Sequence, residues 1–447
     1  MAQQKPKKKN TSKKSSRLKN ERRRETEKRS SSRKRLGAAA SARAKKKTNA
    51  KVKTKVKAKA KAPVSTASKN GKTPKPAQHV KNAPPAIKEA PLVKTKAVRP
   101  ITAAKSLPVE PKVISPPKRI SKSKMLSRNF LIDLAQAIKT EVTPILGETR
   151  GREIVGSAVS GDATFELDRV AEKALMAFLK SARMPVAYYS EDSGYTTFTS
   201  GQPANLLVVD PVDGSRAAKC GFEGCVVSVC STRVIERPVC ADIDNACVME
   251  LCGNRVFYAE KESGARMYED GHTKKIRLSD NSDLESVAWS MTVPARPAEL
   301  IFPTAAKLID LSSLKGGFFA CNSTSFSLTR LLTGQLDACV DFANRYYRDI
   351  PRVVEDSFIN AGRGTVLGVC PYDFAAAMFI AKEAGCFVTD AYGKNFDEVL
   401  MLDSSVSNHR SLIAASNRAL HDKLFSFLNT RIHQYESLLK RRVEVGA

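Results

Sequence analysis

Residues 206–215, Leu-Leu-Val-Val-Asp-Pro-Val-Asp-Gly-Ser, place two carboxylates, a glycine and a hydroxyl directly after an apolar run. The run predicts a buried strand, and Pro211, which has no N–H to donate, is expected to end the ladder and turn the chain. Asp210 and Asp213 would then share one space, which two like charges tolerate only around a cation or a shared proton. Mg²⁺ prefers such oxygen ligands, and N–H groups after Gly214 could open a helix and bind an anion. Metal-assisted phosphate chemistry is predicted; a plain Asp-Pro turn is the alternative.

Two further acidic groups follow predicted element boundaries. Residues 185–190 read as a short strand, and Glu191 and Asp192 come directly after it. Asp373 precedes the apolar stretch 374–384, which predicts a helix that stops at Gly385. Taken alone, Asp373 would be interpreted as the cap of that helix. Together with the first group, it is a candidate metal ligand.

The order and content of these motifs resemble the Mg²⁺-dependent, lithium-sensitive phosphatases typified by inositol monophosphatase, with fructose-1,6-bisphosphatases and bisphosphate nucleotidases as relatives. The matching stretches run from about residue 127 to about residue 428. They are 161–172, 190–193, 210–215 and 372–377, with supporting matches at 389–394 and 412–417. Residues 161–168 resemble the archaeal type of sugar-bisphosphatase and inositol phosphatase in particular.

The resemblance implies a role for each matched residue. Glu191, Asp210 and the Val212 carbonyl would hold one Mg²⁺, and Asp210, Asp213 and Asp373 a second, with two or three ions in each site. Asp168 and Ser215 would orient and deprotonate the attacking water, so that the implied catalytic residues are Asp168, Ser215 and Glu191. The implied substrate contacts are Gly214, Ser215 and Asp213, with the N–H groups of Gly214 and Ser215 cradling the phosphate.

The chain departs from the family pattern at several positions. Ser215 stands for a threonine and Asp192 for a glutamate, and both keep the functional group. Tyr372 replaces a tryptophan, which we expect to reshape the packing around Asp373. Residues 365–370 lack the acidic residue with which inositol-binding members hold their substrate. This absence makes sugar phosphates and nucleotide phosphates better candidate substrates than an inositol phosphate. Three basic residues are candidate contacts for a second phosphate, although solvated surface charge is the favoured interpretation of each: Arg216, Lys219 and Arg345.

The function implied is a Mg²⁺-dependent phosphomonoesterase acting on a small phosphorylated metabolite, either an inositol monophosphate or a sugar bisphosphate. Three alternatives stay open. Two are 3′(2′),5′-bisphosphate nucleotidase and histidinol-phosphatase activities. The third is a retired fold that serves as a nucleic-acid-associated interaction protein. Five converging carboxylates count against a retired fold, because their mutual repulsion is unfavourable without a metal.

Charge divides the chain into two parts. Residues 1–125 contain 40 Lys and Arg against 5 Asp and Glu, a net charge of +35, and the remaining residues contain 35 against 40, a net charge of −5. The first part is rich in Lys, Arg, Ala and Pro and nearly devoid of aromatic residues, so it is predicted to be disordered. Its composition resembles linker-histone tails. Nucleic acid or another polyanion is the predicted partner, and a solubilising spacer is the alternative.

The second part, residues 126–447, is long enough for two packed α/β halves, about 126–290 and 291–447. The fold class predicted is α/β, or layered α+β, and the resemblance implies an αβαβα sandwich and a homodimer. No membrane span or signal peptide is predicted, so a cytoplasmic protein is expected, with nucleoid or nuclear association through the tail. All ten cysteines lie in this part without a Cys-x-x-Cys pair, which favours reduced thiols over disulfides or zinc. Redox sensitivity at Cys220 and Cys225, just after the metal loop, is a minor hypothesis.

Overall fold

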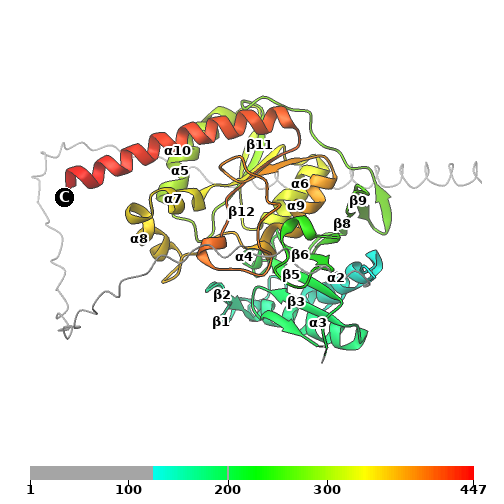
Figure 1. Cartoon of the computed structure of the whole chain (residues 1–447). Coiled ribbons are helices and arrows are strands. Elements are labelled where there is room, and N and C mark those ends of the chain that lie inside the picture. The colour runs from blue at the N-terminus through cyan, green and yellow to red at the C-terminus, as the bar shows by residue number, and fades with distance from the viewer. Residues whose placement is uncertain (1–123, 199–200, 447) are drawn as a thin grey trace, which may run out of the picture. The chain divides into compact units, whose positions relative to one another are not determined.

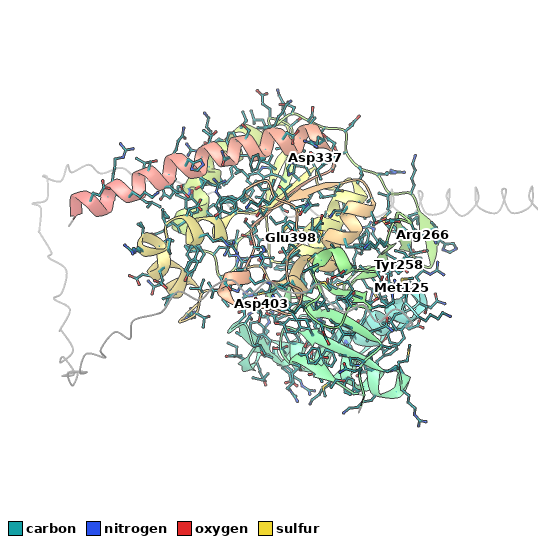
Figure 2. The ribbon with its side chains drawn as sticks, viewed as in Figure 1. Met125, Tyr258, Arg266, Asp337, Glu398 and Asp403 are labelled. Atoms are coloured by element: carbon teal, nitrogen blue, oxygen red, sulfur yellow. The ribbon has the colours of Figure 1, made fainter. Side chains whose placement is uncertain are left out.

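The computed structural model describes residues 124–198 and 201–446, so that nearly all of the predicted basic tail lies outside the described residues. Helices and sheets alternate through these residues in five layers, and the side chains fill the space between them (Figures 1 and 2). This layered α/β arrangement confirms the predicted fold class and the αβαβα sandwich.

The first layer is a pair of helices, α2 (Arg128–Val142) and α3 (Glu166–Ala182), packed on one face of an eight-stranded sheet. The strand order of this sheet is β10-β9-β8-β7-β6-β5-β3-β4. Only β3 and β5 run parallel; the other neighbours are antiparallel. The strands are β3 (Val186–Ser190), β4 (Gly194–Thr197), β5 (Asn205–Asp213), β6 (Val226–Thr232), β7 (Asn245–Glu250), β8 (Arg255–Glu260), β9 (Ala265–Glu269) and β10 (His272–Lys274).

The other face of this sheet is covered by α6 (Thr324–Thr333) and α9 (Pro371–Glu383), which form the middle layer. Beyond them lies a five-stranded sheet with the order β12-β11-β13-β15-β14. Its strands are β11 (Ala288–Thr292), β12 (Gly317–Cys321), β13 (Ala338–Asp341), β14 (Phe387–Thr389) and β15 (Leu412–Ala415). The last layer holds α5 (Ala298–Ser312), α7 (Ala343–Asp349), α8 (Pro351–Ala361) and α10 (Arg418–Gly446).

Two helices have well-defined ends. Ser127 caps α2, with its Oγ accepting a hydrogen bond from the Phe130 N–H at 3.2 Å. The helix predicted at 374–384 is α9, and Gly385 follows it with a φ of +96°. Two short elements complete the part near the acidic groups. They are the hairpin of β1 (Ile154–Ser157) with β2 (Ala163–Phe165), and the one-turn helix α4 (Ser215–Ala218).

The prediction that Pro211 ends the buried strand was wrong, because β5 continues through the proline to Asp213. Asp210 pairs with Ser228 and Asp213 with Val226, so three steps along β5 match two along β6. The extra residue is a β-bulge, a place where a proline removes no hydrogen bond that the ladder needs. The bulge keeps Asp210 and Asp213 on a rigid strand rather than on a free turn.

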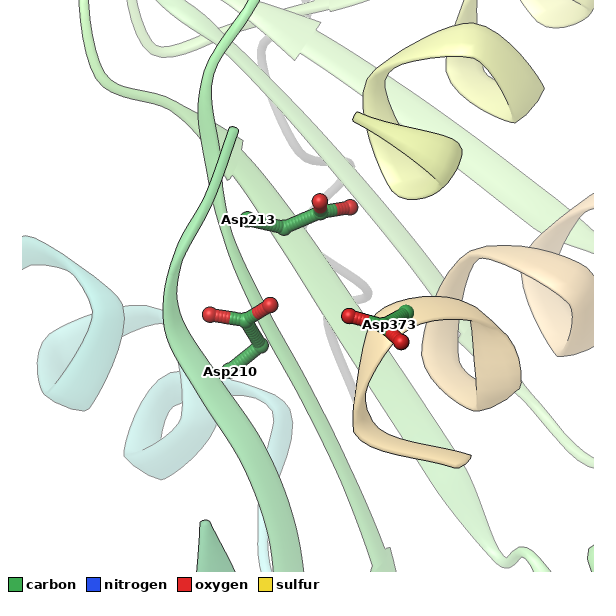
Figure 3. Close-up of side chains that lie close together, drawn as sticks. All are labelled: Asp210, Asp213 and Asp373. Atoms are coloured by element: carbon green, nitrogen blue, oxygen red, sulfur yellow. The ribbon is translucent and has the colours of Figure 1, made fainter. Parts of the chain in front are cut away.

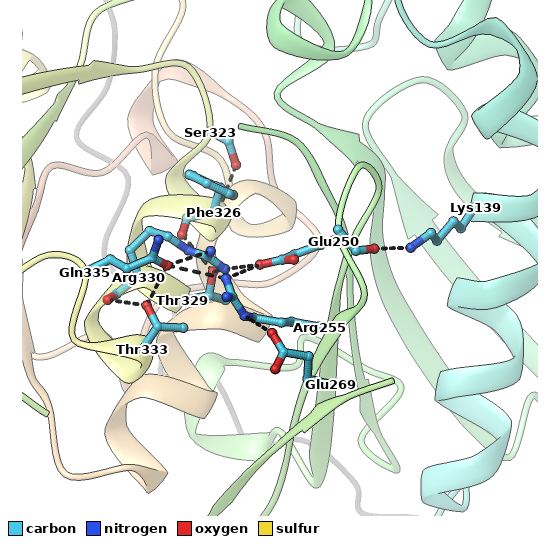
Figure 4. Close-up of polar contacts among 11 residues, drawn as sticks. Lys139, Glu250, Arg255, Glu269, Ser323, Phe326, Thr329, Arg330, Thr333 and Gln335 are labelled. Atoms are coloured by element: carbon cyan, nitrogen blue, oxygen red, sulfur yellow. Dashed lines mark hydrogen bonds and ion pairs between the residues drawn. The ribbon is translucent and has the colours of Figure 1, made fainter. Parts of the chain in front are cut away.

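A buried ion pair joins the middle layer to the first sheet. Arg330 of α6 donates to Glu250 at the end of β7, and both side chains are less than a tenth exposed (Figure 4). Arg255 lies 3.6 Å from the same carboxylate. Burial lowers the pKa of Arg330 while Glu250 raises it, so the guanidinium depends on its partner.

We expect Arg330→Met to lower the free energy of unfolding by about 3 kcal/mol, because it leaves a buried carboxylate short of its main partner. The measurement is urea denaturation of the full chain. Lys315→Met is the matched control, since its pair with Glu285 is exposed and contributes less than about 1 kcal/mol. Equal losses in the two variants would contradict this assignment.

None of the helices in the described part of the chain is long and apolar enough to cross a membrane. All ten cysteines are free thiols. Cys230 is 1% exposed in β6, where it packs as a small apolar side chain.

Candidate active site

The parallel pairing of β3 and β5 brings their carboxyl ends to the same edge of the first sheet. Ser190, the last residue of β3, pairs with Val209 of β5. Glu191 therefore follows β3 at the level where Asp210 follows Val209. This single parallel pair explains why acidic groups nearly 20 residues apart in the sequence share one pocket.

All of the sequence-predicted site residues line this pocket. Three helix starts supply those that the two strands do not: α3 supplies Asp168, α4 supplies Ser215 and α9 supplies Asp373. The predicted residues found there are Asp168, Glu191, Asp210, Val212, Asp213, Gly214, Ser215 and Asp373.

Three carboxylates of the pocket face one another. Asp210, Asp213 and Asp373 each offer an oxygen within 4.8 Å of the other two (Figure 3). In each, one oxygen also accepts a backbone N–H, from Val212 at 3.0 Å, Ser325 at 2.7 Å and Cys370 at 2.6 Å respectively. These hydrogen bonds fix the orientation of the carboxylates before any ligand binds.

Burial and mutual repulsion oppose ionisation of this cluster. Burial raises the pKa of Asp213 to about 6, and burial together with neighbouring carboxylates holds the pKa values of Glu191, Asp210 and Asp373 well above their usual range. A divalent cation removes this repulsion. The all-oxygen donor set, preset by backbone hydrogen bonds, fits a hard ion such as Mg²⁺.

Asp168 and Ser215 form a hydrogen-bonded pair beside the cluster. Ser215 Oγ lies 2.7 Å from Asp168 Oδ1 and 3.1 Å from the Val212 carbonyl oxygen, while Asp168 Oδ2 accepts the Phe165 N–H at 2.8 Å. Burial raises the pKa of Asp168 to about 7, helped by Asp192 and Asp162 and opposed by the hydrogen bonds from Ser215 and Phe165. A carboxylate that titrates near neutrality is suited to proton transfer.

Gly214 makes the turn between the cluster and Ser215. Its φ is +99°, and a Cβ at this position would lie 2.4 Å from the Gly224 carbonyl oxygen. Only glycine fits both the conformation and the space. Ser215, the first residue of α4, follows this turn directly.

The start of α6 is a part of the site that the sequence interpretation missed. The Ser325 N–H of this helix donates to Asp213, which lies more than 100 residues away in the sequence. Ser323 caps the helix by accepting the Phe326 N–H at 2.8 Å. The partial positive charge of the helix start also favours the Asp213 carboxylate. Asn322 and Thr324 line the pocket here.

Two arginines line the pocket, and only one of them was singled out in the sequence. Arg216 binds Asp162 through both ends of its guanidinium, at 2.7 and 3.1 Å. Arg296, which was missed, lies in the wall and pairs with buried Asp341 at 2.9 Å. It follows Ala295, whose φ of 56° shows a tight turn. No pattern in the sequence predicts this turn.

The other two basic residues considered for a second phosphate lie elsewhere. Lys219 places its ammonium 3.8 Å from the centre of the Phe165 ring. Arg345 is 4% exposed and donates to the Ala391 carbonyl at 2.6 Å, so neither the phosphate contact nor the surface charge considered for it is right. Its position in α7, packed under Tyr392, explains the burial.

A layered α/β architecture with a carboxylate cluster suited to divalent cations is typical of metal-dependent phosphatases. The family model described as "Inositol monophosphatase family" matches residues 127–433. The chain belongs to the inositol monophosphatase family.

The chain is also similar to individual proteins. It is 25% identical over 311 residues to the bifunctional NADP phosphatase/NAD kinase of Methanococcus maripaludis, a match that covers 67% of this chain and 49% of that relative. The chain thus spans about half the length of that protein. It is 26% identical over 303 residues to the fructose-1,6-bisphosphatase/inositol-1-monophosphatase of Methanothermobacter thermautotrophicus, covering 66% of this chain and 94% of the relative. The solved structure of Thermotoga maritima IMPase aligns with a TM-score of 0.49 at 19% identity, over 68% of this chain and 98% of that one.

Proposed function

We propose that this protein hydrolyses a small phosphorylated metabolite, either an inositol monophosphate or a sugar bisphosphate, in a Mg²⁺-dependent phosphomonoesterase reaction. The observation that carries the proposal is the meeting of Asp210, Asp213 and Asp373 within 4.8 Å, beside the hydrogen-bonded Asp168–Ser215 pair. Metal-assisted hydrolysis requires one set of groups to bind the metal and another to transfer a proton, and this pocket contains both.

The proposed metal ligands are Glu191, Asp210, the Val212 carbonyl, Asp213 and Asp373, with two or three ions in each site. Bound there, Mg²⁺ would neutralise phosphoryl oxygens and acidify water. Ser215 Oγ accepts a hydrogen from the attacking water while it donates its own to Asp168 Oδ1, so that the proton ends on the Asp168 carboxylate. The N–H groups of Gly214 and Ser215 bind the phosphate oxygens.

The experiment that tests the function measures Mg²⁺-dependent phosphate release by the full chain from a panel of substrates. The panel contains inositol 1-phosphate, fructose 1,6-bisphosphate, NADP, adenosine 3′,5′-bisphosphate and histidinol phosphate, with Asp213→Asn as the blank. Turnover that requires Asp213 supports the proposal. If no substrate of the panel releases phosphate and Mg²⁺ binding produces no heat, the result would instead support a retired fold.

A nucleotide phosphatase is the second candidate function. The relative from Methanococcus maripaludis that covers two thirds of this chain is named for NADP phosphatase activity. Residues 365–370 carry no acidic side chain that would hold an inositol ring, which leaves room for other alcohols. Faster turnover of NADP or adenosine 3′,5′-bisphosphate than of the sugar phosphates would favour this candidate.

Arg216 is the proposed contact for a second phosphate. Its guanidinium lies in the pocket wall, where Asp162 holds it by two hydrogen bonds. We expect Arg216→Ala to raise KM for fructose 1,6-bisphosphate about 10- to 100-fold, the value of a hydrogen bond to a charged group, and to change KM for inositol 1-phosphate much less. Steady-state kinetics on both substrates measure this. Arg266→Ala is the control, since Arg266 is an exposed arginine of β9. An equal rise for both substrates would show that Arg216 only positions Asp162.

We also propose that residues 1–125 bind nucleic acid or another polyanion. Through this tail the protein could associate with a nucleoid or a nucleus. We further propose that the protein is a cytoplasmic homodimer. The net charge of +35 supports tail binding through counterion release. The full chain should bind duplex DNA and RNA of any sequence, with an affinity that falls steeply as salt rises. Binding that is unchanged between low and high salt would rule out this mode; sedimentation tests the dimer.

A further inference from the structure

Two thiols lie side by side at the end of the first sheet, next to the Gly214 turn. Cys225 directly precedes β6, and Cys252 lies two residues after β7. Their Sγ atoms are 3.8 Å apart. The antiparallel ladder fixes them there, because Val226 pairs with Glu250 and the Leu251 N–H binds the Cys225 carbonyl at 3.1 Å. A disulfide needs about 2.05 Å between the sulfurs, so a small local movement would join them.

The two thiols differ in a way that suits them to oxidation. Cys252 is exposed, whereas Cys225 is buried. The hydrogen bond from the Cys225 thiol, with help from Lys139, lowers the pKa of Cys252 to about 7, and the same interaction with burial raises that of Cys225. Lys139 is held beside this turn by its hydrogen bond to the Gly253 carbonyl (Figure 4). Cys252 therefore provides an accessible thiolate near neutral pH, and Cys225 a partner within reach.

The backbone around Cys225 contacts Asp213 and Gly214, two residues of the candidate active site. Val226, the residue after Cys225, pairs with Asp213 in the ladder between β5 and β6. Gly224, the residue before it, leaves no room for even a methyl group at Gly214. Both Sγ atoms also lie 3.5 Å from the Phe222 carbonyl, in the loop that returns from α4. A movement of Cys225 toward Cys252 thus displaces the backbone against which Gly214 and Asp213 are packed.

We propose that Cys225 and Cys252 form a reversible disulfide that lowers the phosphatase activity of the adjacent site. The oxidant is hydrogen peroxide. The Cys252 thiolate attacks one peroxide oxygen, the O–O bond breaks, and Cys252 becomes a sulfenic acid while the other oxygen leaves and takes a proton as water. The Cys225 sulfur then attacks the Cys252 sulfur, the S–O bond breaks, and a second water leaves with the Cys225 proton. Two thiols lose two electrons and the peroxide gains them. A dithiol reverses the reaction by thiol–disulfide exchange.

The test treats the full-length protein with hydrogen peroxide and follows two readouts. Peptide mapping without reduction should find the Cys225–Cys252 linkage. Phosphate release should fall with the same time course, about tenfold or more, because sub-ångström to 1 Å displacements of positioning groups have effects of this size. Dithiothreitol should reverse both changes. The second readout depends on the proposed function, whereas the first does not, so failure of the two ideas can be told apart.

Matched variants complete the design. Cys252→Ser should abolish the linkage and protect the activity, and Cys220→Ser, which removes another exposed thiol of the same loop, should change neither response. Cys225→Ala should leave a sulfenic acid on Cys252 that dimedone traps; circular dichroism confirms that this variant folds. The proposal is overturned if the linkage fails to form, if it forms without loss of activity, or if Cys252→Ser loses activity to peroxide as the unaltered protein does.

Discussion

Asp213→Asn will retain the fold and lose at least about a thousandfold in kcat. The asparagine carbonyl can still accept the Ser325 N–H that binds Asp213 at 2.7 Å, so the start of α6 stays in place. What disappears is one negative charge from a cluster whose proposed task is to hold Mg²⁺. Loss of several kcal/mol of charge stabilisation corresponds to this factor, since each 1.36 kcal/mol is tenfold in rate.

Two measurements define this result. Phosphate release at saturating Mg²⁺ gives kcat, and isothermal calorimetry gives the heat of Mg²⁺ binding, which should weaken together with kcat. Asp310→Asn makes the same chemical change on an exposed carboxylate of α5 and should leave both values unchanged. Mg²⁺ binding and turnover near the unaltered level in Asp213→Asn would refute the proposed ligand set.

Asp168→Asn will lower kcat about 100- to 10,000-fold while Mg²⁺ binding persists, because general-base catalysis contributes a factor of this size. Asp168 accepts hydrogen bonds from both Ser215 and the Phe165 N–H, and an amide has only one oxygen with which to replace two. Ser215→Ala should show a related loss that Ser215→Thr does not, since threonine keeps the hydroxyl. Loss of Mg²⁺ binding in Asp168→Asn would instead indicate that Asp168 is itself a ligand of Mg²⁺.

The pH profile separates Asp168 from the metal cluster. Burial raises the pKa of Asp168 to about 7, and the active form is the carboxylate, which accepts the proton. At saturating Mg²⁺, kcat should therefore rise with pH through about 7 and level off above it. In Asp168→Asn this rise should be missing. A rise that persists unchanged in the variant would assign the titration to another group.

The sequence was sufficient to predict the site residues that follow strongly marked elements. Apolar runs ending in acids located Glu191 and Asp210, and the helix signal of α9 placed Asp373 at its start. These patterns are local, because a buried strand or the end of a helix can be recognised from residues that are consecutive in the sequence. Their convergence depends on the parallel register of β3 and β5, and for that the family resemblance was needed.

What could not be predicted depends on contacts between distant segments. Pro211 reads as a strand terminator until β6 is known to accommodate a bulge opposite it. Arg296 has no distinguishing neighbours in sequence, and its place in the pocket comes from its pair with Asp341. The thiol pair is hidden in the sequence for the same reason: Cys220 is near Cys225 along the chain, but the spatial neighbour of Cys225 is Cys252, which follows β7.

Asp168 and Asp373 share a second property. Each is the third residue of its helix and accepts the backbone N–H of the residue that precedes the helix, at Phe165 and Cys370. Such a contact typically stabilises a helix by about 1 kcal/mol. In a lineage that abandoned catalysis, selection for folding alone would therefore preserve these two acids. The presence of these two acids alone does not distinguish an active phosphatase from a retired fold, whereas Glu191, Asp210 and Asp213 lie outside the helices, so this contact does not explain them.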